Sequence, residues 1–322
     1  MQNQLTLLSL TELRMILSNG SLLMKTVNED KKSVDMVEEM HSELQGLLVD
    51  VRKKRAFSPS KWVNKKVDAL NQYAKASGIA GCVVNLSGGV DSAVTFALLS
   101  RAKATETSPI TRVLGIAQPI SSTMSIQNRA YELSSYGEIV TVDQTDIFGL
   151  LAPLMEDACG IRGKEFARGN LKSYMRTPVA FYVTQLLSQE GIPSVVVGTG
   201  NYDEDGFLYY FSKAGDGVSD IQLIHDLHKS EVFAVGRYLG IPESILNAPP
   251  SADLWEGQTD EAEIGTSYDF VELYVSLERD EALKQRLATM SHEAQLQYEK
   301  VGKLLCSIHA RNGHKKVFPL NI

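Results

Sequence analysis

The sequence predicts an α/β fold, a doubly wound and mainly parallel sheet with helices on both faces, plus an N-terminal helical extension. From residue 61 onward, short apolar runs bounded by glycine or polar residues alternate with stretches of helical periodicity, and a glycine-rich loop directly follows the first run. Strand, helix and strand in this order require right-handed crossovers, which cover both faces of a parallel sheet. The preceding residues lack this alternation. We therefore divide the chain into a helical extension, residues 1–60, and an α/β domain, residues 61–322.

The N-terminal extension is predicted to contain two helices. Apolar residues recur at near-helical spacing in two groups, Leu7, Leu10, Leu13 and Leu17, then Val34, Met36, Val37, Met40, Leu44 and Leu47. A short basic run, Arg52–Arg55, follows the second group. We interpret this run as a solvated helix end rather than as a contact for nucleic acid or membrane.

The α/β domain opens with a helix and continues with four predicted strands. Its first helix carries one apolar face and is stopped by Gly78; that face consists of Val63, Val67, Leu70 and Ala74. The strands are short apolar runs at Gly81–Leu86, Arg112–Ala117, Glu138–Val142 and Ser194–Val197. Helical patterns lie at Ser92–Lys103, Ser125–Tyr136, Leu171–Gln189 and Lys229–Leu239, and further helices run from about Ser267 to His309. Ligands of such sheets bind at the carboxyl ends of the strands, so candidate site residues are sought there.

Composition and charge exclude several classes of protein. With 322 residues, 43% hydrophobic and 22% charged, the chain is neither collagen-like nor wholly disordered. Its net charge of −7 argues against a nucleic-acid partner, which usually selects a basic excess. The cysteines, Cys82, Cys159 and Cys306, are far apart and form no C-x-x-C pair, which fits a reducing compartment without disulfides or structural zinc. No apolar run reaches the roughly 20 residues that span a bilayer and no signal peptide is evident, so we expect a cytoplasmic protein without a membrane partner.

The loop after the first strand is the first candidate for chemistry. Ser87-Gly88-Gly89-Val90-Asp91-Ser92 joins the strand to a helix, and its glycines permit a tight turn and close approach of a ligand. Consecutive N–H groups at a helix N-terminus, with the hydroxyls of Ser87 and Ser92, form an anion site. Asp91 would repel a phosphate unless a divalent cation lies between them, which implies Mg²⁺. The alternative is an ordinary capped turn. The spacings of a Walker A loop and of a dinucleotide-binding G-x-G-x-x-G loop are both absent.

This string resembles the pyrophosphate-binding loop of the N-type ATP pyrophosphatases, whose fold is adenine nucleotide alpha hydrolase-like. The resemblance implies that ATP is split between its α and β phosphates and that the substrate becomes adenylylated. The superfamily includes synthetases that amidate GMP, asparagine or NAD precursors, argininosuccinate synthetase and tRNA-thiolating enzymes. The loop by itself does not choose among them.

Later segments of the chain distinguish among these enzymes. They resemble ammonia-dependent NAD(+) synthetase in order and content over about residues 61–322: Val197–Asn201 with Glu204, Phe211–Gly217 with Asp220, Lys229, Pro249–Trp255, Gln258–Glu261 and Gly313–Lys316. The first three correspond to G-T-G-N with a glutamate, F-[ST]-K-x-G-D-G, and the lysine that opens the next helix. Together with the glycine loop they predict an NAD synthetase.

The resemblance implies roles at the ATP end of the site. ATP is expected to contact the loop from Ser87 to Ser92 and three further residues, Thr199, Lys229 and Ser251. Mg²⁺ is expected between Asp91 and Glu204, with Asp91 and Lys229 catalytic. Elementary electrostatics supports the lysine, because a cation in the first turn of a helix opposes the helix dipole unless it meets an anion. Glu204 taken alone would be an ordinary solvent-facing acid, and the two hydroxyl residues would be routine cap or turn residues.

It also implies roles at the acceptor end. Deamido-NAD is expected to contact Lys213, Asp220, His314 and Lys315, and Asp216 is expected to receive or orient ammonia. Many members have an arginine where this chain has Tyr174, and Arg176 on the same helix is the alternative contact. Without the resemblance, the pair at 314–315 would be a basic tail. His225 and His228 are interpreted as structural, because no carboxylate pattern completes a zinc site beside them.

The predicted function is the ATP-dependent amidation of deamido-NAD to NAD through an adenylylated nicotinate carboxylate, with AMP and pyrophosphate as products. Ammonia is the expected donor, because residues 1–60 are too few to form a glutamine amidase domain; a separate glutaminase is the alternative source. The resemblance also implies a homodimer. Two rival interpretations are a tRNA-modifying member of the superfamily, which the acidic charge and lack of paired cysteines disfavour, and a non-catalytic ATP-binding protein.

Overall fold

A computed structural model describes residues 37–251, 255 and 257–317. These described residues group into one compact unit. The first predicted helix, at residues 7–17, lies outside the described residues. Within the described part, no helix is both long and apolar enough to cross a membrane.

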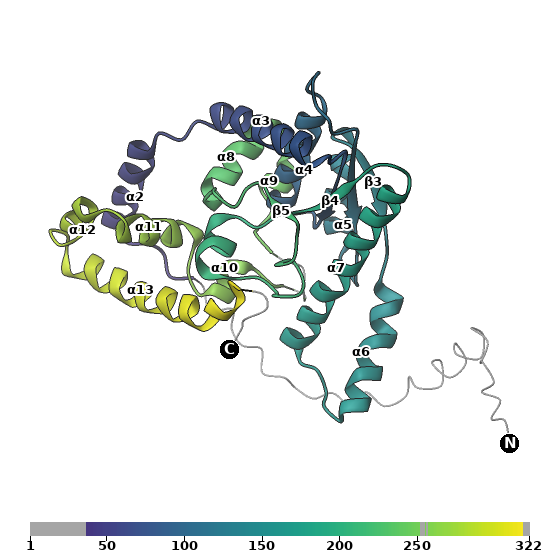
Figure 1. The fold of residues 1–322 in the computed structure, drawn as a ribbon. Helices are drawn as coiled ribbons and strands as arrows, with labels where there is room; N and C mark the ends of the chain where they lie inside the picture. The colour runs from purple at the N-terminus through teal and green to yellow at the C-terminus, as the bar shows by residue number, and fades with distance from the viewer. Residues whose placement is uncertain (1–36, 252–254, 256, 318–322) are drawn as a thin grey trace. The chain divides into compact units, whose positions relative to one another are not determined.

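A five-stranded parallel sheet forms the centre of this unit (Figure 1). Its strands are β1 (Gly81–Leu86), β2 (Arg112–Ala117), β3 (Glu138–Thr141), β4 (Ser194–Gly198) and β5 (Ile221–Gln222). Their spatial order is β3-β2-β1-β4-β5, and every neighbouring pair is parallel. The chain therefore winds outward in one direction from β1 and then in the other, and the switch falls between β1 and β4. Loops leaving these two strands diverge there and open a crevice at their carboxyl ends.

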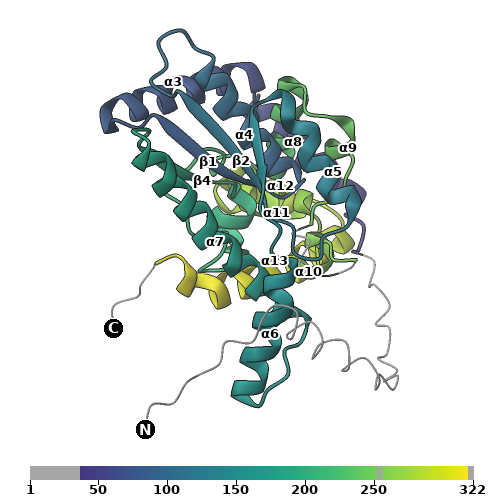
Figure 2. The ribbon, with the colours of Figure 1, turned by 90° about the vertical axis from the view of Figure 1, so that its right-hand side faces the viewer.

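Helices cover both faces of the sheet, which confirms the predicted fold class (Figure 2). The helices on one face are α3 (Pro59–Ser77), α4 (Val90–Lys103) and α8 (Lys229–Leu239), and the helix on the other is α7 (Glu165–Gln189). Successive side chains of β1 point to opposite faces of the sheet. Cys82 and Val84 pack in the larger apolar core on one face, and Val83 packs with Leu187 of α7 in a smaller core on the other. The predicted stop of α3 is confirmed, since Gly78 adopts the left-handed φ of 66°.

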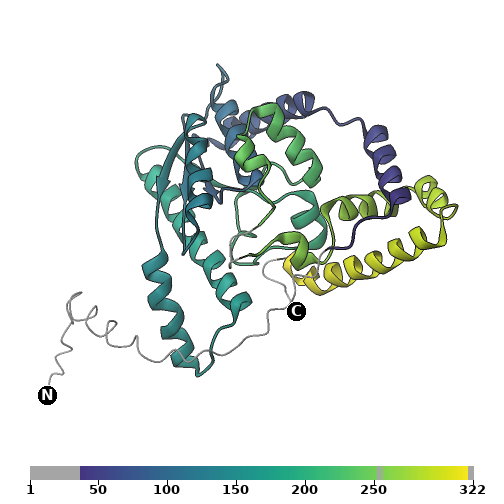
Figure 3. The ribbon, with the colours of Figure 1, turned by 180° about the vertical axis from the view of Figure 1, so that it is seen from behind.

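A second apolar core lies beside the sheet domain and joins the two ends of the described chain (Figures 1 and 3). It is built by α2 (Ser42–Arg55), α11 (Tyr268–Glu278), α12 (Glu281–Leu287) and α13 (His292–Asn312). The second predicted N-terminal helix exists, but it begins at Ser42, so Val37 and Met40 precede it. Met40 is still buried in this core.

Charged side chains fasten α2 to its neighbours. Arg52 contacts Glu272 at 2.6 Å and Asp269 at 2.5 Å, and Arg55 pairs with Glu272 and, at 3.0 Å, with Glu231. The prediction that 52–55 is a solvated helix end is therefore wrong for both arginines, which find acidic partners more than 170 residues away in sequence. Such partners leave no signal in the local pattern. Lys53 and Lys54 are exposed as predicted.

The remaining elements connect these layers. They are α5 (Met124–Glu132), η1 (Leu133–Ser135), α6 (Thr145–Cys159), η2 (Tyr202–Leu208), α9 (Glu243–Leu246), α10 (Asp260–Ile264) and η3 (Gly313–Lys315). Of these, η2 is a π-helix, a rare conformation that recurs at functional sites. It directly follows the loop after β4 and carries Glu204.

Candidate active site

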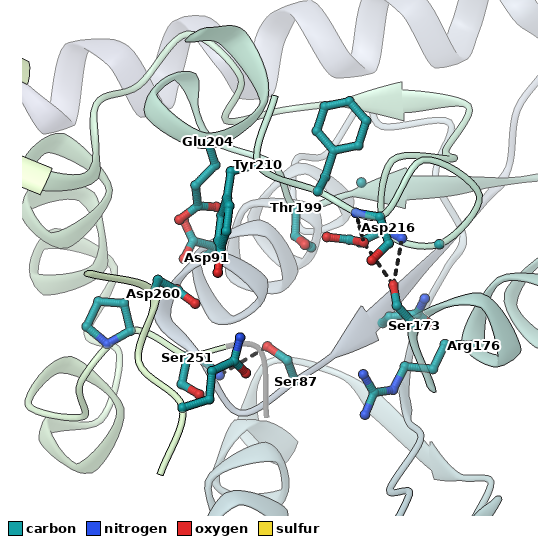
Figure 4. A pocket seen from close by; sticks show the side chains of 18 of the residues that line it. Ser87, Asp91, Ser173, Arg176, Thr199, Glu204, Tyr210, Asp216, Ser251 and Asp260 are labelled. Atoms are coloured by element: carbon teal, nitrogen blue, oxygen red, sulfur yellow. Dashed lines mark hydrogen bonds between the residues drawn. The ribbon is translucent and has the colours of Figure 1, made fainter. Parts of the chain in front are cut away.

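A cavity of about 680 Å³ lies at the carboxyl ends of β1 and β4. Its walls come from the loops after both strands, from α5, α7 and α10, and from the start of α8. Figure 4 shows Asp91, Glu204 and Asp260 on one side of this space and Ser173, Arg176 and Asp216 on the other. A volume of this size suits a nucleotide-sized ligand. The cavity thus has two chemically different ends at the sheet's switch point.

The glycine loop has the conformation that anion binding requires. Gly88 has φ = +76°, which favours glycine, and α4 starts two residues later at Val90. The Oγ atoms of Ser87 and Ser92 lie 3.1 Å apart, and the Gly89 N–H donates to Ser87 Oγ at 3.3 Å. All residues of the predicted loop line the cavity except Ser92, which is buried behind it. The Ser92 hydroxyl therefore fixes the shape of the loop from within.

Lys229 joins two predicted residues at the first end of the cavity. Its Nζ lies 2.7 Å from Asp91 Oδ2 and 2.8 Å from Glu204 Oε1. Burial opposes a charge on this amine, but the two carboxylates outweigh burial and hold the pKa of Lys229 above its usual range. The amide of Asn201 also donates to Asp91 Oδ1 at 2.9 Å. The fold thus brings Asp91 of α4 and Glu204 of η2 to the ammonium group at the start of α8.

A buried pair of side chains holds Lys229 in place. His228 Nδ1 lies 2.6 Å from Asp203 Oδ1, and the other oxygen of Asp203 accepts from the Lys229 backbone N–H at 2.8 Å. Glu231 accepts from the His228 backbone N–H at 3.0 Å and completes a capping box at the start of α8. The interpretation of His228 as structural is consistent with this geometry. Because Asp203 and Glu204 are adjacent in η2, the same π-helix positions the lysine and one of its partners.

Two further residues at this end were not predicted. Tyr268 donates to Glu204 Oε1 at 2.5 Å and to Asp260 Oδ2 at 3.2 Å. Burial raises the pKa of Asp260 to about 7, and the nearby charge of Glu204 adds to the effect. Asp260 belongs to the motif segment Gln258–Glu261, to which the sequence assigns no individual role. Tyr268 opens α11 outside the motif segments, and only the folded chain places its hydroxyl beside Glu204.

The second end of the cavity centres on Asp216. Its Oδ1 accepts from Ser173 Oγ and from the Ser212 backbone N–H, both at 2.9 Å. Surrounding protein atoms raise the pKa of this carboxyl, although it faces the open cavity. The approach of α7 depends on Gly215, because a Cβ there would lie 2.1 Å from Ser173 Oγ. An anchored carboxylate facing the cavity is suited to bind a small cation.

The predicted acceptor contacts divide into two groups. Arg176 and Lys315 line the cavity, and Lys315 Nζ donates to the carbonyls of Phe211 at 2.6 Å and Tyr209 at 3.1 Å. Thr199 and Ser251 line it as well. Four others lie outside the cavity wall as described: Tyr174, Lys213, Asp220 and His314.

Two of those four make hydrogen bonds elsewhere, and a third is exposed. Asp220 Oδ2 accepts from the Val196 backbone N–H at 2.7 Å and so ties the loop before β5 to β4. Lys213 Nζ donates to the His314 carbonyl at 2.7 Å, which joins the loop to the C-terminal segment. Tyr174 is exposed on α7. Their predicted roles toward a dinucleotide therefore stay predictions.

The residues present fit Mg²⁺ only together with a phosphate ligand. Among the described residues, no three His, Cys, Asp or Glu side chains converge closely enough to hold a metal ion. Asp91 and Glu204 do converge, each within 2.8 Å of the same ammonium nitrogen. Two carboxylates completed by substrate phosphates and water form a usual Mg²⁺ set in nucleotide enzymes.

Comparison with known proteins identifies the family. The family model described as NAD synthase matches residues 62–319, which is most of the chain. The chain belongs to the NAD synthase family. This confirms the resemblance inferred from its motifs.

Individual relatives agree with the family assignment. The chain is 31% identical to an NH(3)-dependent NAD(+) synthetase of Methanosarcina acetivorans over 80% of this chain and 95% of that protein. It is 36% identical to one of Methanococcoides burtonii over 64% of this chain and 74% of that protein. The NMN synthetase structure from Francisella tularensis superposes with a TM-score of 0.67 at 27% identity and covers 83% of this chain and 99% of that one. The cavity of this NAD synthase family member thus lies in a fold that the Francisella tularensis structure shares over 99% of its length.

Proposed function

We propose that this chain makes NAD by amidating the nicotinate carboxylate of deamido-NAD, with ammonia as nitrogen donor and with ATP converted to AMP and pyrophosphate. It is a ligase that forms a C–N bond, as its family membership establishes. The observation that carries the proposal is the convergence of the glycine loop, Asp91, Glu204 and Lys229 on one cavity whose far end holds Asp216. An anion-binding end and a cation-binding end are the two features that adenylylation followed by attack of ammonia requires.

At the first end, the loop from Ser87 to Ser92 holds the pyrophosphate portion of ATP, and Thr199 and Ser251 supply hydroxyl contacts. Lys229 has a charged amine within reach of the same phosphates, so it stabilises the negative charge that develops as the pyrophosphate leaves. Mg²⁺, held by Asp91 and Glu204, would neutralise charge on the phosphate oxygens. As in phosphoryl transfer generally, positioning and charge stabilisation supply most of the acceleration.

The reaction requires two substitutions. The nicotinate carboxylate oxygen attacks the α phosphorus, the bond to the β phosphate breaks, and pyrophosphate leaves with that electron pair. Ammonia nitrogen then attacks the activated carbonyl carbon, and AMP departs as the C–O bond breaks. An ammonium ion must lose one proton before it attacks, and its nitrogen loses a second proton to water as the amide forms. We assign the first transfer to Asp216, and its anchored carboxylate at the far end of the cavity supports that assignment.

The direct test is product formation from ATP, Mg²⁺, deamido-NAD and ammonium, with glutamine replacing ammonium in a parallel reaction. Equal amounts of NAD and AMP, lost in Asp91→Ala, are expected, with no NAD from glutamine. ATP binding without AMP would favour a non-catalytic ATP-binding protein. AMP without NAD would indicate another acceptor, such as the tRNA of a modifying enzyme. NAD formed from glutamine by the pure chain would contradict the ammonia assignment.

Nicotinate mononucleotide is a second candidate acceptor. Two observations favour it: the similarity to an NMN synthetase at 27% identity, and the position of four predicted dinucleotide contacts outside the cavity wall. Amidation of the mononucleotide would use the same ATP end and the same Asp216. A comparison of kcat/KM for the two acceptors decides the point, because a dinucleotide enzyme should prefer deamido-NAD by at least about tenfold.

We also propose that the chain works as a cytoplasmic homodimer. All three cysteines are free, which suits a reducing compartment. An apolar stripe on α6, consisting of Ile147, Leu150, Leu154 and Met155, is exposed on the single chain. Exposed stripes of this kind mark protein contacts.

A further inference from the structure

Helix α5 packs directly on the glycine loop, at a place to which neither the motifs nor the family resemblance assigned a role. Gly88 has φ = +76°, and a Cβ at this position would lie 2.6 Å from the Ile126 carbonyl oxygen of α5. A side chain here would therefore meet both backbone strain and a rigid neighbour. The loop and this helix form one unit, so what α5 presents to the cavity is fixed relative to the loop.

Arg129 is the residue that α5 places beside the loop. Its Nε–H donates to the Gly88 carbonyl at 3.0 Å, and its side chain lines the cavity. Within the described chain, this is its one hydrogen bond, and it forms no ion pair. Both terminal nitrogens, Nη1 and Nη2, are therefore available to a ligand while Nε keeps the guanidinium oriented.

Six other described arginines each pair with at least one carboxylate: Arg52, Arg55, Arg112, Arg162, Arg168 and Arg286. Arg311 of α13 also lines the cavity and forms no ion pair within the described chain, but Arg129 is the arginine that hydrogen-bonds to the glycine loop. A guanidinium that lines a cavity without an acidic partner has unused charge, and its planar pair of terminal N–H groups matches two phosphate oxygens. The position of Arg129 beside an anion-binding loop indicates which ligand would use that charge.

The balance of charges at this end of the cavity also favours a phosphate contact for Arg129. Asp91, Glu204 and Asp260 bring carboxylates to the ATP end, and the Lys229 ammonium is already shared between the first two. The loop itself contributes N–H dipoles and hydroxyls but no cation. Even with Mg²⁺ bound as proposed above, the negative charge of ATP and these carboxylates exceeds the positive charge of Mg²⁺ and Lys229, so a further positive group on the loop side of the cavity would stabilise a bound triphosphate.

We propose that Arg129 binds the pyrophosphate portion of ATP through Nη1 and Nη2, while its Nε–H bond to Gly88 ties that contact to the shape of the loop. This inference rests on the proposed function, because it assigns ATP to this cavity. The arginine stabilises the charge that accumulates on the leaving pyrophosphate, so it acts in the adenylylation step and not in the attack of ammonia.

The test compares binding of ATP, AMP and pyrophosphate by calorimetry in Mg²⁺ buffer. Arg129→Gln is expected to weaken ATP and pyrophosphate about 10- to 100-fold, the loss of one charge-assisted contact, and to leave AMP unchanged. Arg129→Lys should recover only part of this loss, because an ammonium group cannot reproduce the paired contact. The matched control is Arg112→Gln, which removes an exposed arginine paired with Glu138 at the sheet edge.

The ratio of AMP to ATP dissociation constants is the decisive quantity, because partial unfolding lowers the binding stoichiometry but not this ratio. An Arg129→Gln protein with the wild-type ratio would overturn the inference. So would a loss of AMP and ATP affinity in equal proportion, since that indicates a role in adenosine binding or in folding. Wild-type protein that binds ATP yet makes no NAD contradicts the proposed function, while the binding comparison still decides the role of Arg129.

Discussion

At the scale of single residues, Lys229 is the group on which the ATP end of the cavity depends. Its ammonium lies between Asp91 and Glu204, which would repel each other without it. In the proposed function, phosphates and Mg²⁺ enter the same region when substrate binds. The lysine is the counter-ion of these two carboxylates, and under that proposal it then becomes a partner of the phosphates.

Replacing this lysine should expose the role of counter-ion directly. Lys229→Met leaves two largely enclosed carboxylates, 17% and 15% exposed, without a counter-ion, so we expect a loss of about 3 kcal/mol of unfolding free energy in the absence of ligands. Mg²⁺ should restore stability to the variant more than it adds to the wild type, because a cation can replace the missing ammonium. Thermal unfolding across a MgCl₂ titration measures both effects.

Lys66→Met serves as the control for Lys229→Met, because Lys66 pairs with the exposed Asp226 at the surface. This change should cost less than about 1 kcal/mol and should not alter the response to Mg²⁺. If Lys229→Met unfolds at the wild-type temperature, or responds to Mg²⁺ no more than the wild type does, the counter-ion role is wrong.

A second prediction at this scale concerns ammonia. Asp216→Asn keeps the size of the side chain and removes its charge, so it loses a charge-assisted contact with ammonium. We expect the KM for ammonium to rise about 10- to 100-fold while the affinity for ATP stays unchanged. Steady-state kinetics with ammonium as the varied substrate tests this. Asp226→Asn, which alters an exposed carboxylate outside the cavity, should leave both constants unchanged.

At the scale of elements, α2 is the clearest case of a helix held by partners far away in the sequence. Leu44, Leu47 and Val51 bury its apolar face against the C-terminal helices. Glu272 of α11 then accepts from both Arg52 and Arg55 and from the Ser230 hydroxyl of α8. These contacts link α2 to the first turn of the helix that carries Lys229.

This ion cluster should make stability depend on pH in a defined direction. Burial alone would raise the pKa of Glu272, but Arg52, Ser230 and Arg55 lower it below its usual range. A carboxyl whose pKa is lowered by folding contributes stability that is fully present above its unfolded pKa of about 4.3 and is lost as the pH falls through the lower folded value. Glu272→Gln should therefore cost about 2 kcal/mol or more at pH 7 and progressively less below pH 4.

Thermal unfolding of wild type and Glu272→Gln at pH 7 and at pH 3.5 checks this prediction. Glu138→Gln is a fair comparison, because Glu138 pairs with one arginine at an exposed edge and its loss should change the melting temperature little at either pH. A Glu272→Gln deficit that is the same at both pH values would show that packing, and not charge, holds α2.

Helices and strands whose bounds are set by neighbouring residues in the sequence could be predicted. Those whose bounds depend on hydrogen bonds formed only in the folded chain could not. The bounds of β1, β2 and α8 follow from apolar runs and adjacent turn residues, and the structure reproduces them. The two-residue β5 depends on the Asp220 carboxylate, which accepts a hydrogen bond from the Val196 backbone N–H of the neighbouring strand β4. The start of α2 at Ser42 is marked by the preceding His41, whose ring accepts from Glu43 N–H, a contact that the apolar period does not reveal.

The residues of the candidate site divide in the same way, into those that sequence motifs identify and those that only the folded chain brings together. Ser87–Ser92, Glu204 and Lys229 could be found because contiguous motifs contain them. Arg129 lines the cavity from α5, a helix that no motif contains, and Tyr268 of α11 contacts two lining residues, Glu204 and Asp260, without lining the cavity itself. Only the packing of these helices makes the two residues functional candidates. For Lys213 and Asp220 the structure adds internal hydrogen-bond partners that the motif does not reveal, and their dinucleotide contacts stay predictions.

At the scale of the whole molecule, the helices α6 and α7 are the part of the described chain with the most unpartnered apolar surface. They lie side by side and extend together beyond the sheet in Figures 1, 2 and 3. Leu150 and Leu154 of α6 are 53% and 67% exposed, and Phe166 and Tyr182 of α7 are 66% and 64% exposed. Residues of α7 also line the cavity, so a second copy on this face would lie close to the acceptor end of the site.

If this face is the dimer interface, a charge placed on it should separate the subunits. Leu150→Glu combined with Leu154→Glu buries two carboxylates against apolar partners in the dimer but exposes them to water in the monomer, so the monomer is favoured by several kcal/mol. Light scattering at micromolar concentration should give about twice the chain mass for the wild type and the chain mass for the variant. Leu296→Glu, at an equally exposed position on α13, should stay dimeric. A monomeric wild type, or a dimeric double variant, would exclude this face as the interface.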